Sequence, residues 1–128
     1  MWWSKMADQA NDSPIKFITP PGVALKDKTV DVEHINSVLQ AFLVVAGLVH
    51  MHLFNSLLTV TSGKDAKHAQ SSKHYIGNAI DLRIVDLPPD YQPVFILYLR
   101  VLCDRFHLAL FDESNVPGAG HVHIEIAG

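Results

Sequence analysis

The stretch from His121 to Ile126 alternates strictly between polar and apolar side chains. Successive side chains on a β-strand point to opposite faces, so this alternation is typical of a strand with one buried and one open face. His121, His123 and Glu125 would share the open face, where two histidines at this spacing can serve one metal ion or one reacting group. The alternative interpretation is a pair of exposed histidines on a solvated strand.

A second stretch, residues 79 to 85, alternates in the same way. The pattern places Asp81 on one face with Gly77, Ala79 and Arg83, and the apolar residues on the other. The small residues beside Asp81 would let a ligand approach closely. His74 lies just upstream, near the end of a polar loop predicted over residues 62 to 76.

Apolar residues at three- and four-residue steps predict two helices. The first would be capped by Asp31 and would bury Ile35, Val38, Leu39, Phe42, Val45 and Ala46. The second, over residues 89 to 105, would open at Pro88 and Pro89 and bury Val94, Leu97, Val101 and either Leu102 or Cys103. With further strands at residues 57–61 and 107–111, the layout predicts an α+β fold in which helices cover one face of an antiparallel sheet.

The length of 128 residues fits one folded domain. We expect residues 1–31 to form an extended N-terminal arm and residues 32–128 to form the domain. The arm is interpreted either as a strand or loop wrapped on the domain, or as an assembly arm that docks on a neighbouring molecule.

Composition excludes several classes of function. A net charge of −3 without clustered basic residues argues against nucleic-acid binding. The longest apolar run, Ala41–Val49, is too short to span a bilayer, and the start at Met1–Lys5 does not resemble a signal peptide. Synthesis in the cytoplasm is therefore expected. A single cysteine, Cys103, rules out an intramolecular disulfide and any thiolate-rich metal site.

A candidate metal site combines His74, Asp81 and a histidine of residues 121–126. Two imidazoles and one carboxylate supply three ligands to a tetrahedral zinc ion, and the fourth position stays open for water, as in catalytic zinc sites. Manganese or iron could occupy such a site as well.

These residues carry a family resemblance. Residues 72–81, Ser-Lys-His-Tyr-Ile-Gly-Asn-Ala-Ile-Asp, resemble the S-x-H-x-x-G-x-A-x-D motif of the zinc D-Ala-D-Ala carboxypeptidases, peptidase family M15. His121-Val122-His123 is similar to the closing H-x-H motif, which is shared with murein endopeptidases and the hedgehog signalling domain. Small phage or prophage members are the nearest likeness, which covers about residues 57 to 126. The resemblance implies a hedgehog/DD-peptidase-like fold.

The resemblance also implies roles for individual residues. His74, Asp81 and His123 would bind zinc, and His121 would stabilise the oxyanion or orient the substrate. The family places a carboxylate general base shortly before the last ligand, where this chain has Gly118 and Gly120 instead. The nearest candidates for the catalytic base are Glu113, which we favour because the end of a strand positions a side chain well, and Asp112.

Substrate contacts also depart from the family pattern. Many members have an arginine directly after the Ser-Gly pair, and this chain has Lys64 there. Lys64, Lys67 or His68 would substitute for it, although lysine lacks the bidentate geometry of arginine. The alternative interpretation, which the polar loop favours for each of them, is a solvated charge. Ser72 is a further candidate for substrate binding and is expected to hydrogen-bond within the loop and orient His74.

Together these features predict a zinc metallopeptidase that cleaves peptidoglycan stem peptides, as a DD-carboxypeptidase or an endopeptidase of the endolysin type. It would act on the cell wall after release, or as part of a virion. One alternative is a catalytically weak or inactive zinc-binding interaction or virion module, with residues 1–31 mediating self-assembly or virion contact. Another is a metal-dependent hydrolase with a different substrate.

Overall fold

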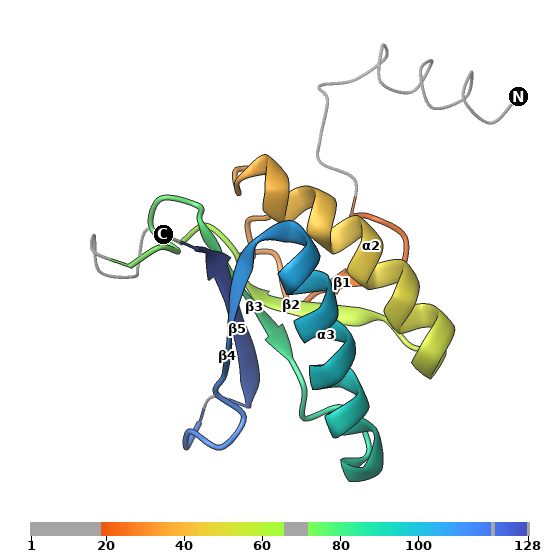
Figure 1. Cartoon of the computed structure of the whole chain (residues 1–128). Helices are drawn as coiled ribbons and strands as arrows, with labels where there is room; N and C mark the ends of the chain where they lie inside the picture. The colour runs from red at the N-terminus through yellow and green to blue at the C-terminus, as the bar shows by residue number, and fades with distance from the viewer. Residues whose placement is uncertain (1–18, 66–71, 119, 128) are drawn as a thin grey trace, which may run out of the picture.

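The computed structural model describes residues 19–65, 72–118 and 120–127. Five strands form one sheet in the order β1-β2-β3-β5-β4, and two helices cover one of its faces (Figure 1). The elements in chain order are β1 (Val23–Leu25), α2 (Ser37–Phe54), β2 (Leu58–Ser62), β3 (Ala79–Arg83), the short 3₁₀ helix η1 (Pro89–Tyr91), α3 (Gln92–Phe106), β4 (Leu108–Asp112) and β5 (His121–Ile126). The predicted α+β class is confirmed.

The pairing of the strands corrects one part of the predicted sheet. The pairs β2–β3, β3–β5 and β4–β5 are antiparallel, as expected, but β1 and β2 are parallel. The reason is that α2 lies between them in the chain and acts as a crossover helix, which returns β2 in the direction of β1. The sheet is therefore mixed at this edge.

Part of the predicted arm lies against the domain. Within residues 1–31 the structure describes residues 19–31, where β1 adds a strand to the sheet and Val23 and Val30 are buried. These residues match the interpretation of a strand wrapped on the domain. Residues 1–18 lie outside the described residues, so an assembly role for them stays a prediction.

The first helix begins later than predicted. Asn36 caps α2, and its side chain accepts a hydrogen bond from the backbone N–H of Val38 at 2.8 Å. Asp31 caps no helix, because its backbone forms a bridge with Lys64 and stays extended. Its carboxylate instead accepts the N–H groups of Glu33 and His34 in the turn that follows.

The predicted core face of the second helix is wrong, apart from Cys103. Val94, Leu97 and Val101 are exposed on α3, whereas Phe95, Tyr98, Leu99 and Cys103 are buried. Apolar residues recur at helical spacing on both faces of α3, so periodicity alone does not select the buried one. On α2 the prediction holds for Leu39, Phe42 and Ala46 but not for Val38, which is exposed.

The core lies between the sheet and the two helices. Alternation along the strands turns their apolar side chains toward the helices and buries Leu58, Val60, Ile80, Leu82, Val122 and Ile124 completely. The polar residues of β3 and β5 consequently face the other side of the sheet.

One helix in the described part of the chain, α2, is long and apolar enough to cross a membrane. A single such helix is a weak indication, because the core helices of soluble proteins pass the same test. In this fold α2 packs one face on the sheet and α3, and the expected absence of a membrane span stays a prediction.

Candidate metal centre

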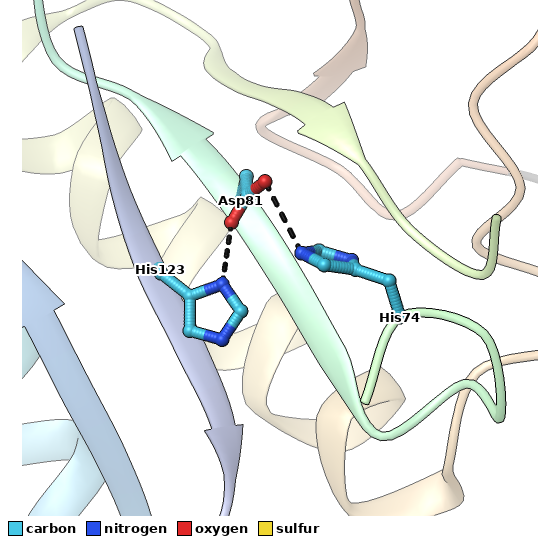
Figure 2. Close-up of side chains that lie close together, drawn as sticks. All are labelled: His74, Asp81 and His123. Atoms are coloured by element: carbon cyan, nitrogen blue, oxygen red, sulfur yellow. Dashed lines mark hydrogen bonds and ion pairs between the residues drawn. The ribbon is translucent and has the colours of Figure 1, made fainter. Parts of the chain in front are cut away.

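The candidate centre lies on the face of the sheet that the helices leave open. Asp81 in β3 stands directly opposite His123 in β5, and His123 also stands opposite Phe111 in β4. His74 comes from the turn that precedes β3 (Figure 2). Three segments that are distant in sequence thus meet at Asp81.

Side chains from these segments converge closely. His123 Nδ1 lies 2.8 Å from Asp81 Oδ1, and His74 Nε2 lies 3.2 Å from Asp81 Oδ2 (Figure 2). One ligand atom from each of the three residues can be chosen so that all lie within 4.8 Å of one another. Ligand atoms bound to one tetrahedral zinc ion at about 2.0–2.1 Å are separated by about 3.3 Å. His74, Asp81 and His123 therefore form a group that can hold a metal ion.

His74 is held in place from its other ring nitrogen. Its Nδ1 lies 2.9 Å from the carbonyl oxygen of Gly63, which orients the ring so that Nε2 faces Asp81. Only glycine fits at position 63, because an added Cβ would come within 1.9 Å of the Asp31 carbonyl oxygen. The expected hydrogen bond between Ser72 and the loop is present, because the backbone N–H of His74 donates to Ser72 Oγ at 3.2 Å.

The electrostatics of the centre favour a cation. Burial of Asp81 opposes its charge, but the hydrogen bonds from His123 and His74 outweigh this and hold the pKa of the carboxyl well below its usual range. Burial likewise acts to lower the pKa of His74 and of His123, yet the hydrogen bonds with Asp81 leave both pKa values above the usual one. Asp81 is thus an ionised, buried carboxylate with two imidazoles beside it.

Glu113 and His121 adjoin the three candidate ligands. The backbone N–H of Glu113 donates to the His121 carbonyl at 3.1 Å, which places the two side chains on the open face together. Glu113 Oε1 lies 2.8 Å from His121 Nε2, and that nitrogen lies 3.8 Å from Asp81 Oδ2. The structure therefore brings this predicted catalytic pair next to the candidate ligands.

Asp112 points elsewhere. It pairs with Val122, whose side chain is buried under the helices, so its own side chain belongs to that face of the sheet. Its carboxylate accepts the backbone N–H of Ser114, and this hydrogen bonding lowers its pKa. It lines a surface hollow together with residues that include Ile84, Pro89 and Gln92. The sheet thus separates Asp112 from the candidate centre.

The predicted substrate contacts are less well placed by the structure. Lys64 is exposed, and its backbone N–H donates to Asp31. Lys67 and His68 lie outside the described residues. The substrate-binding roles of Lys64, His68 and Ser72 stay predictions.

Sequence reasoning gave no role to two neighbours of His123, Glu125 and Phe111, or to Lys73, which contacts Glu125. Glu125 Oε1 lies 2.9 Å from His123 Nε2, Lys73 Nζ lies 3.0 Å from Glu125 Oε2, and the Phe111 ring lies 6.0 Å from the His123 ring. The alternation of β5 already placed Glu125 on the face of His123, which was the available signal. Lys73 gave none beyond being adjacent to His74.

No protein-family model matches this chain, and no curated protein matches it either. Its likeness to peptidase family M15 therefore stays a prediction that rests on the two motifs.

Proposed function

We propose that this chain is a zinc peptidase that cleaves peptide bonds in peptidoglycan stem peptides. The observation that carries the proposal is the convergence of His74, Asp81 and His123, with Glu113 and His121 beside them. A ligand set of two imidazoles and one carboxylate, with a second carboxylate adjacent, is the donor chemistry of a hydrolytic zinc site. The choice of peptidoglycan stem peptides as the substrate is supported by the resemblance of the two motifs, in sequence and in order, to those of peptidase family M15.

His74, through Nε2, Asp81 and His123, through Nδ1, would hold the metal ion. The fit is good because the other nitrogen of each imidazole already faces an acceptor, the Gly63 carbonyl for His74 and the Glu125 carboxylate for His123. When bound, zinc supplies a Lewis acid that polarises the scissile carbonyl and lowers the pKa of a water molecule.

Glu113 and His121 would perform the proton transfer and charge stabilisation. Glu113 accepts a proton from the attacking water and later delivers it to the nitrogen of the leaving amine, so the carboxylate is regenerated. His121 Nε2, between Glu113 and Asp81, donates a hydrogen bond to the oxygen that becomes negative as water adds to the carbonyl.

The open face of the sheet suits a peptide substrate. Phe111 is 49% exposed beside His123 and offers an apolar surface next to the reacting groups. Trimming of a terminal D-Ala and cleavage within the stem peptide are both consistent with this surface. In either case we place the action at the cell wall, after release of the protein or within a virion.

Digestion of purified stem peptides, followed by mass spectrometry of the fragments, tests the proposal. Glu113→Gln should lower the cleavage rate by about a hundredfold or more while zinc stays bound, because it removes the base and keeps the side-chain shape. Asp112→Asn is the matched control and should cleave at nearly the wild-type rate. The absence of cleavage by the wild type with any metal would instead favour a zinc-binding interaction module.

A further inference from the structure

We propose that Glu125 and Lys73 are positioning residues for the metal centre, which fix the ring of His123 so that Nδ1 is its ligand atom. This inference rests on the proposed function. It adds to the centre the ion pair between Lys73 and Glu125, to which the sequence analysis gave no role.

The His123 ring lies between two carboxylates. Its Nδ1 is 2.8 Å from Asp81 Oδ1, and its Nε2 is 2.9 Å from Glu125 Oε1. A neutral imidazole carries one N–H, so only one nitrogen can donate while the other keeps a lone pair. A metal ion bound by Asp81 and by the lone pair of His123 Nδ1 would exclude a proton from that nitrogen. The N–H is then at Nε2, where Glu125 accepts it.

Lys73 holds the Glu125 carboxylate in this role. Its ammonium group lies 3.0 Å from Glu125 Oε2, the oxygen that does not face His123, and it also donates to the carbonyl of Ile126. The side chains of Lys73 and Glu125 are 29% and 21% exposed, so the pair is partly shielded from water. Each oxygen of Glu125 therefore has its own partner.

The ion pair also joins the two segments that carry the histidine ligands. Lys73 directly precedes His74, and Glu125 follows His123 by two residues on the same face of β5. Backbone hydrogen bonds from Asn78 to Lys73 (2.8 Å) and from Ile126 to Asn78 (2.9 Å) continue this connection. Loss of the ion pair should mainly release the orientation of the His123 ring. Its effect on the distance between the two segments should be smaller.

Competition titration of the purified protein with a chromophoric zinc chelator tests the inference. Glu125→Ala should weaken zinc binding by about 10- to 100-fold, the usual effect of removing a partner behind a histidine ligand. Glu125→Gln keeps an oxygen that accepts the Nε2–H and should recover most of the affinity. Lys73→Met should have an intermediate effect. The exposed residues Asp90 and Lys28 provide matched controls as Asp90→Asn and Lys28→Met.

Two further measurements separate positioning from folding. Cobalt(II) absorption should change in Glu125→Ala, because the visible bands report the ligand geometry. Urea unfolding of the metal-free protein should change much less than zinc affinity does. Zinc affinity within about twofold of wild type in both Glu125→Ala and Lys73→Met would overturn the inference. If the wild type binds no zinc, the proposed function fails, and this inference fails with it.

Discussion

At the scale of single residues, the candidate centre is defined by what each histidine contacts on its second nitrogen. His74 meets the Gly63 carbonyl and His123 meets the Glu125 carboxylate, so both rings have a fixed orientation toward Asp81. The motifs predicted which residues converge, and strand alternation predicted their common face. Neither could predict Glu125 or Lys73 as partners, because alternation determines a face but not a hydrogen bond.

His50 supplies a prediction about pH. It is buried between α2 and α3, where its Nδ1 lies 2.9 Å from the Tyr98 hydroxyl, and burial lowers its pKa from 6.5 to about 4. The contribution of neutral, buried His50 to the free energy of unfolding is therefore fully present above pH 6.5 and is lost as the pH falls toward 4. Over this interval His50 binds a proton in the unfolded chain but not in the folded chain. The loss is about 3 kcal/mol by pH 4.

Urea unfolding of wild type and His50→Gln between pH 4 and pH 7 measures this contribution. The difference between the two free energies of unfolding should grow with pH across this interval, and taking the difference removes the opposite trend expected from His74 and His123. A flat difference for His50→Gln would contradict the assignment of His50 as a neutral buried residue.

At the scale of elements, the boundaries of β5 were predicted better than the start of α2. The β5 boundaries follow directly from its alternation, because a period of two over six residues has few other interpretations. The start of α2 could not be predicted in this way, because Asp31 and Asn36 are both residue types that cap helices. The bridge between Asp31 and Lys64 keeps Asp31 outside the helix, and Asn36 is the cap. A contact that is distant in sequence cannot be predicted from local pattern.

The turn that carries His74 depends on Gly77. This residue has φ of +80°, its carbonyl accepts the backbone N–H of Asn36, and an added Cβ would lie 2.6 Å from the His34 carbonyl oxygen. Gly77→Ala should lower the free energy of unfolding by more than the roughly 1–3 kcal/mol that a strained backbone alone costs, because it also meets a backbone atom. It should weaken zinc binding as well.

Gly118→Ala is the matched control. Gly118 has the same φ of +80°, but nothing lies within 4 Å of its added Cβ. Chemical denaturation should therefore show only the backbone cost for this variant. Equal losses for the two variants would mean that the contact with His34 does not constrain the turn.

At the scale of the whole molecule, the sheet brings the centre together from a turn and three strands. The antiparallel arrangement of β3, β5 and β4 was predicted. These strands carry Asp81 and His123, and Glu113 directly follows β4. The parallel edge was not predicted, because β1 has only three residues and its direction is fixed by α2. The convergence of these residues could thus be predicted without the complete topology.

Metal binding should stabilise the whole fold. Because the three candidate ligands come from separate segments, zinc would bind the folded chain in preference to the unfolded one, and at a hundred times its dissociation constant it should add about 2.7 kcal/mol to the free energy of unfolding. Thermal unfolding followed by circular dichroism should show a higher midpoint with zinc and a return to the original value with a chelator. An unchanged midpoint would indicate that the three ligands do not act together.

The central claim is that one metal ion is held by His74, Asp81 and His123. The most direct test is the zinc content of the purified protein by elemental mass spectrometry after zinc loading and desalting, compared between wild type, Asp81→Asn and the exposed-site control Asp86→Asn. We predict one zinc ion per chain in the wild type and in Asp86→Asn, and almost none in folded Asp81→Asn. A wild type without zinc, or an Asp81→Asn variant that retains it fully, would contradict the claim.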